Sequence, residues 1–168
     1  TIYTNHFPLV SNSCFVNNPV NDLIQTRQYR SPEVLLGLPY DTSADIWSLA
    51  CMTFELATRK HLFDPTNGDD EDDLSENRHV FDAIHLSMIE NVLGRVPEDW
   101  AKEGKNYNLL FNEDGELRHV HSEQMSCVYD LIRTHGLPKK EGAELADFLE
   151  PMLAIIPSQR PSAEELLQ

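Results

Sequence analysis

Cysteine and histidine, the residues most often used as nucleophiles or metal ligands, are scattered along this chain. The three cysteines, Cys14, Cys51 and Cys127, are too few and too far apart for a disulfide framework or a metal knuckle. The seven histidines, including His119 and His121, show no helical metal spacing with a third ligand. We therefore expect no metal site, and we expect the histidines to be surface or insert residues.

Carboxylates are the dominant charged groups. The formal net charge is −15 over 168 residues, and an acidic run covers residues 67–76. Such a charge repels nucleic-acid phosphates, so direct binding to nucleic acid is not expected. The charge favours basic partners such as arginine-rich peptides. An equally simple interpretation is that the acidity only keeps the protein in solution.

Length and composition predict one globular domain. The chain has 168 residues, of which 40% are hydrophobic and 24% charged, as in ordinary soluble proteins. No run approaches the roughly 18 apolar residues of a membrane span, so no membrane partner is expected. No signal peptide opens the chain, and because it does not begin with Met we expect a segment of a longer protein. The sparse cysteines, with Cys51 a small buried hydrophobe, fit the cytoplasm or nucleus.

The elements that would position functional residues begin with a loop. Residues 1–24 mix β-forming residues with Asn, Ser and Pro, which predicts a short strand or two and then irregular structure. Residues 25–40 form a loop interrupted by Pro32, Gly37 and Pro39. Within that loop, residues 32–36 could form one helical turn, because proline suits the first position of a helix.

A helix is predicted for residues 43–58. Thr42 or Ser43 can cap its N-terminus, and no proline interrupts it. Its apolar residues cover all faces, which predicts a helix buried in the middle of the domain.

After the acidic loop, the pattern is again helical. Apolar residues recur from Phe81 to Val92 at helical spacing, and Gly94 offers a C-terminal stop. Residues 95–140 look irregular, with one short helix near residues 124–133. Two final helices are predicted at residues 141–153, where Pro151 should kink or shorten the first, and at residues 162–167. A capping box from Ser162 to Glu165 begins the second. The predicted fold class is mainly α.

Four sequence anchors, in order, resemble the C-terminal lobe of a eukaryotic protein kinase. Thr26 with Tyr29-Arg30-Ser31-Pro32-Glu33 is similar to the end of the activation segment, the loop that holds the substrate peptide. Asp45-Ile46-Trp47-Ser48 is similar to the start of the buried central helix. Two further anchors resemble the last helices of the lobe: Asp147-Phe148-Leu149 through Leu153, and Arg160-Pro161-Ser162-Ala163.

Within the kinases, the resemblance is to the SR-protein kinases, which phosphorylate serines in arginine/serine-rich splicing factors. It covers residues 9–168 and rests on phrases such as residues 24–31, 44–48 and 54–58. It implies a partial kinase domain divided into residues 1–40 (end of the activation segment and peptide-site loop), 41–94 (central helix, acidic loop and next helix), 95–140 (kinase-group insert) and 141–168 (final helices).

The resemblance assigns roles to several side chains. Thr26 and Arg30 would belong to the substrate-binding site. Glu33 and Arg160 would form a buried, bidentate ion pair that holds the peptide-site loop, although either could instead be an ordinary surface charge.

Asp45 and Trp47 would be structural residues of the central helix. The resemblance has the Asp45 carboxylate accept hydrogen bonds from a catalytic loop. The alternative is that it completes a capping box begun by Thr42.

Most of the catalytic machinery of a kinase cannot be found in this sequence. No glycine loop, ATP-binding lysine or His-Arg-Asp motif is present, and Leu9 stands where the magnesium-binding aspartate would be. Leucine offers no oxygen to a hard cation. We therefore expect no catalytic residue in this chain, and ATP and Mg²⁺ are expected only for a parent protein.

The acidic groove that binds arginine-rich substrates in the family is also altered. Its expected acidic positions carry Lys60, Ile84 and Asn91. Neighbouring carboxylates (Asp64, Asp82, Glu90 and the run 69–76) could substitute for them, although a surface loop is the simpler interpretation of the run.

The resemblance implies the C-lobe portion of a serine/threonine kinase that regulates mRNA splicing, in the cytoplasm and nucleus. The missing N-terminal lobe and arginine/serine-rich proteins would be its partners. The alternatives are a docking module for basic peptides without kinase activity, and a truncated product with no function.

Overall fold

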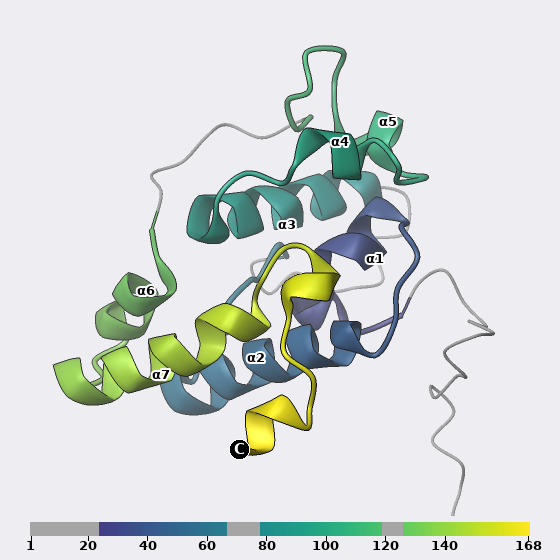
Figure 1. Cartoon of the computed structure of the whole chain (residues 1–168). Coiled ribbons are helices and arrows are strands. Elements are labelled where there is room, and N and C mark those ends of the chain that lie inside the picture. Colours follow the sequence, from purple (N-terminus) through teal and green to yellow (C-terminus); the bar gives the residue numbers. More distant parts are fainter. Residues whose placement is uncertain (1–23, 67–77, 119–125) are drawn as a thin grey trace, which may run out of the picture.

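The computed structural model describes residues 24–66, 78–118 and 126–168, and these residues are mainly helical. Figure 1 shows two levels: α2 and α7 lie together, α3 lies above them with the segment that carries α4 and α5, and α1 lies between the levels. The expectations for residues 1–23 and the acidic run lie outside the described residues. The helices are α1 (Pro32–Leu36), α2 (Ser43–Thr58), α3 (Arg78–Leu93), α4 (Glu98–Ala101), α5 (Tyr107–Leu110), α6 (Val128–Thr134) and α7 (Lys139–Met152), with the 3-10 turns η1 (Arg27–Tyr29), η3 (Pro157–Gln159) and η4 (Glu165–Leu167).

Helix α2 is the centre of the core. Its boundaries are those predicted from the sequence, and it contacts η1, α7 and η3. The indole ring of Trp47 is fully buried and stacks on Phe63, with ring centroids 5.9 Å apart. Phe54 and Cys51 are each 1% exposed. Burial of these large apolar side chains is the main force that holds the two levels together.

One prediction about α2 is wrong: the helix is not buried on every side. Leu49 and Met52 are each 46% exposed, and Leu56 is 83% exposed. The three residues are spaced by three and four positions, so they form one stripe along the helix. Hydropathy alone predicted a buried helix because it cannot tell which segment covers each face. We call Leu49, Met52 and Leu56 the open stripe.

The N-cap residue of α2 is Thr42, one of the two predicted, but its side chain makes no capping hydrogen bond. Instead Asp41 Oδ1 accepts a hydrogen bond from the amide of Ser43 at 2.8 Å. A carboxylate at this end satisfies a free amide and also suits the helix dipole.

Helix α3 ends where the sequence predicted, at Leu93. Gly94 follows with φ of +91°, a conformation that glycine adopts without strain. Its amide donates to the carbonyl of Glu90 at 3.0 Å.

Residues 95–140 are more helical than predicted. The four-residue helices α4 and α5 were missed because each is too short to show a hydrophobic period. The predicted helix near residues 124–133 is α6, which begins at Val128 and ends at Thr134. Between α5 and α6, Phe111 and Leu117 pair as an isolated antiparallel bridge.

The C-terminal elements follow the sequence more closely. Helix α7 spans Lys139–Met152 and contains Pro151 in its last turn, so the proline marks the end of the helix and does not break its middle. The amide of Ser162 donates to Glu165 Oε2 at 2.8 Å and the amide of Glu165 donates to Ser162 Oγ at 3.3 Å, which is a capping box. Only the short 3-10 turn η4 follows it.

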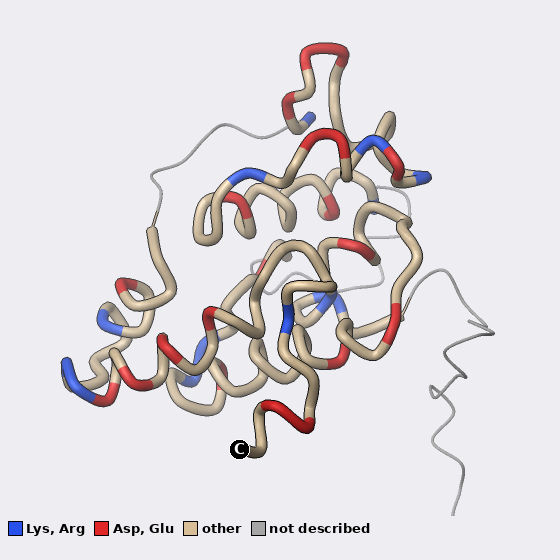
Figure 2. The backbone as a smooth tube through the Cα atoms, viewed as in Figure 1, with Lys and Arg blue, Asp and Glu red and all other residues tan. Residues whose placement is uncertain are grey.

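Acidic residues are spread along the described part of the chain. Figure 2 shows them on α1, α3, α4, α7 and the loop after α5, and the one on α1, Glu33, is buried. Among the described helices, none is long and apolar enough to cross a membrane.

Leu56 and Leu149 allow the open stripe to be tested with one chemical change at two sites. Leu149 is fully buried, so Leu149→Ala should lower the free energy of unfolding by about 2–5 kcal/mol. Leu56→Ala should change it by less than about 0.5 kcal/mol, because an exposed side chain gains little from folding. Urea unfolding followed by circular dichroism measures both. Equal losses in the two variants would mean that Leu56 is covered in solution.

Candidate functional site: the peptide-site loop and its supports

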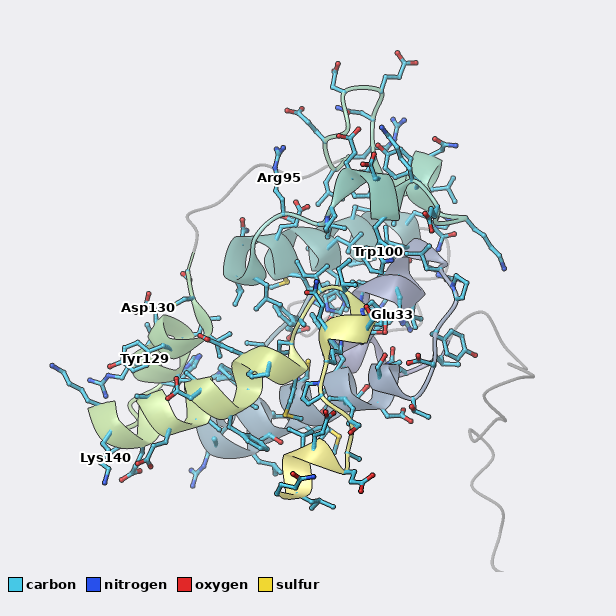
Figure 3. The ribbon with its side chains drawn as sticks, in the orientation of Figure 1. Glu33, Arg95, Trp100, Tyr129, Asp130 and Lys140 are labelled. Carbon is cyan, nitrogen blue, oxygen red and sulfur yellow. The ribbon has the colours of Figure 1, made fainter. Side chains whose placement is uncertain are left out.

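Glu33 and Arg160 form a fully buried, bidentate ion pair. Arg160 Nη1 donates to Glu33 Oε1 and Nη2 donates to Glu33 Oε2, both at 2.7 Å, and both side chains are 0% exposed. Arg160 also donates to the carbonyls of Ser43, Ala154 and Ile155. The guanidinium therefore joins α1, which carries Glu33 (labelled in Figure 3), to the start of α2 and to the segment after α7. Such dense pairing is what a buried charge needs in order to be tolerated.

The same arginine rests on the central tryptophan. Its guanidinium carbon lies 5.0 Å from the centre of the Trp47 ring, a favourable cation–π arrangement. Trp47 thus links the ion pair to the hydrophobic core.

Gln25, to which the sequence analysis gave no role, fixes the start of the peptide-site loop (residues 25–40). It has φ of +67°, and its Oε1 accepts hydrogen bonds from the amide and hydroxyl of Ser31. Its Nε2 donates to the carbonyl of Ala44 and to Ser48 Oγ, both at 2.8 Å. Ser48 in turn donates to the carbonyl of Tyr29. No sequence signal distinguishes a glutamine with positive φ, so this network could not have been predicted.

Thr26 and Arg30, the two predicted substrate-binding residues, differ in burial. Thr26 is exposed and its side chain makes no capping bond. Arg30 is 5% exposed and donates to the carbonyls of Ile24 and Gln25. Arg30 therefore shapes the loop from inside, and a substrate role for either residue stays a prediction.

Three arginines surround one buried carboxylate beside this loop. Asp82 is 1% exposed; its Oδ1 lies 3.1 Å from Arg27 Nη1 and 3.6 Å from Arg30 Nη1, and its Oδ2 lies 3.4 Å from Arg78 Nε. We call Asp82 with Arg27, Arg30 and Arg78 the arginine cluster. It fastens α3 to the peptide-site loop, and its formal charge is positive.

Because of this pairing, the suggestion that Asp82 could bind a basic substrate is wrong. Glu90 is also engaged, since its Oε1 accepts a hydrogen bond from the amide of Val96, and burial raises its pKa. Asp64 accepts hydrogen bonds from the amide and hydroxyl of Thr66. Three of the suggested replacement carboxylates are therefore used within the fold.

His85 lies in the core, contrary to the expectation that the histidines are at the surface. It is fully buried, and its ring centre is 5.7 Å from that of Phe63. Burial, with Arg30 and Arg27 nearby, lowers the pKa of His85 to about 3. The ring is therefore neutral in the folded protein at ordinary pH.

Asp45 is exposed, so its carboxylate is not a buried acceptor in this chain. The predicted capping box between Thr42 and Asp45 is not formed, because the Thr42 side chain makes no capping hydrogen bond. Asp45 lies one turn before Leu49, at the N-terminal end of the open stripe.

A carboxylate on α2 holds the middle of the loop. Tyr29 Oη donates to Glu55 Oε2 at 2.5 Å, and His61 Nδ1 lies 3.3 Å from the same oxygen. The hydrogen bond to Glu55, followed by burial, raises the pKa of Tyr29 to about 12. The phenol therefore stays protonated as a donor.

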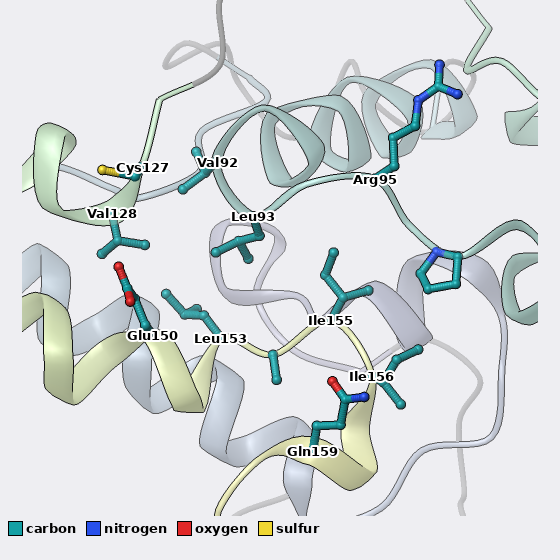
Figure 4. Close-up of a pocket in the computed structure, with 12 residues that line it drawn as sticks. Val92, Leu93, Arg95, Cys127, Val128, Glu150, Leu153, Ile155, Ile156 and Gln159 are labelled. Carbon is teal, nitrogen blue, oxygen red and sulfur yellow. The ribbon is translucent and has the colours of Figure 1, made fainter.

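An open groove lies beside the segment after α7, which also supplies carbonyls to Arg160. Figure 4 shows it between the end of α3, the start of α6 and the segment after α7. Its volume is about 470 Å³, and aliphatic side chains such as Leu93, Leu153 and Ile155 line it. Within the described residues, no group of three or more His, Cys, Asp or Glu side chains could hold a metal.

Comparison with known proteins identifies relatives of the chain. The protein kinase domain family matches residues 10–168. SRSF protein kinase 3 of Sus scrofa and of Homo sapiens are each 39% identical to the chain over 160 residues, which is 95% of it. Protein kinase dsk1 of Schizosaccharomyces pombe is 37% identical over 155 residues, or 92% of the chain. The chain spans only 27% of the length of each of these three relatives.

Removing one partner of the buried ion pair should strongly destabilise the fold. Glu33→Gln leaves the Arg160 guanidinium buried without its counter-charge, so the free energy of unfolding should fall by about 3–5 kcal/mol. Glu144→Gln, which breaks the exposed pair with Lys140, should cause no measurable loss. Chemical denaturation compares the two. A similar small effect at Glu33 would show that the pair does not hold the loop.

His85 should make the fold sensitive to acid. The folded-state pKa is depressed, so between the ordinary value of about 6.5 and about 3 the unfolded chain binds a proton that the folded chain does not. Stability from this group is complete above that range and is lost as the pH falls through it. His85→Phe should therefore lose less unfolding free energy than the unchanged protein between about pH 7 and about pH 4. His79→Phe, the same change at an exposed position of the same helix, is the matched control, and an equal effect of the two substitutions would contradict the role of His85.

Proposed function

Because the chain belongs to the protein kinase family, with SR-protein kinases among its relatives, we propose that it is the peptide-site portion of a serine/threonine kinase C-lobe. In a parent protein, the remaining part of the catalytic domain would bind ATP and Mg²⁺ and supply the catalytic groups. The parent would transfer phosphate to serines of arginine/serine-rich proteins that regulate splicing, in the cytoplasm and nucleus.

The buried Glu33–Arg160 pair is the observation that best supports this proposal. It fixes α1 and the peptide-site loop against α2 and the C-terminal segment. A rigid loop of this kind holds a substrate at a defined distance from catalytic groups, and most of the rate of phosphoryl transfer depends on such positioning. On the same grounds we propose that the chain divides into residues 1–40, 41–94, 95–140 and 141–168, with the roles given in the sequence analysis.

The open stripe suggests that another part of the protein packs against this portion. Leu49, Met52 and Leu56 present an aliphatic surface on the central helix, and such surfaces mark contacts. We propose that the rest of the catalytic domain covers it and also provides donors to Asp45.

A docking module without catalysis remains the second candidate, with less support. In the described residues, Asp64, Asp82 and Glu90 are bonded within the fold, which leaves the acidic run as its basis. Binding of an arginine/serine peptide that weakens steeply with salt would favour it. A nonfunctional truncated product would instead lack a cooperative thermal transition.

The isolated chain should show no magnesium-dependent phosphorylation of an arginine/serine peptide, because the groups that bind ATP and Mg²⁺ are absent from it. Residues 24–168 placed in a relative such as dsk1, in exchange for its matching segment, should restore activity on that peptide. The same chimaera with Glu33→Gln is the control, and it should be less active. Radiolabelled phosphate transfer measures all three.

Turnover by the isolated chain that chelation of Mg²⁺ abolishes would contradict the first expectation. A folded but inactive chimaera would contradict the proposed function. Sequence upstream of Thr1 that encodes a glycine loop, a lysine and His-Arg-Asp would support it.

A further inference from the structure

The C-terminal end of α1 is completed by a residue from a distant part of the chain. Helix α1 has five residues, and the carbonyls of its last turn need donors from outside the helix. Gly37, with φ of +71°, and Leu38 turn back and donate to the carbonyls of Val34 and Glu33. This leaves the carbonyls of Leu35 and Leu36.

Asn106 supplies both remaining donors. Its side-chain Nδ2 donates to the carbonyl of Leu35 at 2.9 Å, and its backbone amide donates to the carbonyl of Leu36 at 3.0 Å. Leu35 and Leu36 are 1% and 0% exposed. A buried carbonyl without a donor is costly, so these two bonds matter to this end of the loop.

The side chain of Asn106 is diverted from its usual task. Asn106 occupies the N-cap position of α5, where asparagine normally accepts a hydrogen bond from its own helix. Here it makes no such bond and reaches α1 instead.

Gly104 brings the two segments into contact. A Cβ at Gly104 would lie 2.4 Å from the carbonyl oxygen of Leu36, so only glycine allows the backbones to approach this closely. Two residues of one short segment are therefore adapted to the end of α1.

We propose that Asn106 is a positioning residue that clamps the C-terminal end of α1 and so holds the peptide-site loop in place. The Glu33–Arg160 pair holds the first turn of the same helix, so α1 is fixed at both ends. Because Asn106 begins α5, this clamp also couples residues 98–118 to the loop. The role of the loop in binding substrate rests on the proposed function.

Asn106→Asp and Asn112→Asp provide a matched test. Both remove one amide and add one negative charge. At position 106 the amide is a donor to a carbonyl, which a carboxylate cannot replace and would repel. At position 112 the side-chain oxygen accepts from the amides of Asp114 and Glu116, a task that aspartate can keep.

Hydrogen exchange and peptide affinity are then measured on the full chain. In Asn106→Asp, the amides of Gly37 and Leu38 should exchange at least roughly fivefold faster, which is the effect of losing one typical hydrogen bond. The exchange rates of the α7 amides should not change. Asn112→Asp should match the unchanged chain. Affinity for an octapeptide of alternating arginine and serine should fall by a similar factor in Asn106→Asp alone. Gly104→Ala should act in the same direction, and thermal melting checks that each variant is folded.

Each outcome decides a different point. Equal exchange in Asn106→Asp and Asn112→Asp, or a uniform rise in all helices, overturns the clamp. Faster local exchange with equal peptide affinity overturns the positioning role. If the unchanged chain binds no peptide, the positioning role fails for the isolated chain, whereas the exchange data still decide whether the clamp exists and the activity of the chimaera separately decides the proposed function.

Discussion

A single buried charge sets most of the constraints on this fold. The Arg160 guanidinium has no access to water, so all its donors must find partners within the protein. Glu33 supplies the counter-charge, and three carbonyls accept hydrogen bonds from Arg160: that of the distant Ser43 and those of Ala154 and Ile155, a few residues before the arginine. Geometry this specific fixes three parts of the chain at once, and the hydrophobic core around Trp47 excludes the water that would weaken it.

A second buried charge, Asp82, fixes α3 to the same loop. One carboxylate faces three guanidinium groups, so the local charge is positive in a protein whose formal net charge is −15. Net charge therefore describes the surface and not the surroundings of the loop. This difference removes the simplest argument for binding basic peptides there, namely that an acidic protein must offer acidic groups everywhere.

The sequence predicted the long elements well and the polar supports poorly. Hydrophobic spacing, with glycine and proline positions, predicted the limits of α2, the end of α3 just before Gly94 and the approximate limits of α7. Short helices such as α4 carry no period and were missed. Gln25 and Asn106 gave no signal, because their roles arise only when distant segments meet. Burial of His85 and exposure of Leu56 depend on neighbouring segments that a local pattern does not contain.

The open stripe has a consequence for how long this chain persists in a cell. Chaperones and proteases recognise exposed aliphatic surface, and small differences in stability change how much of a protein survives. An uncovered row formed by Leu49, Met52 and Leu56 would mark the free chain for removal, whereas a chain whose row is occupied would escape. Its abundance would then follow the supply of whatever covers the row, so this surface would act as a quality-control signal as well as a contact.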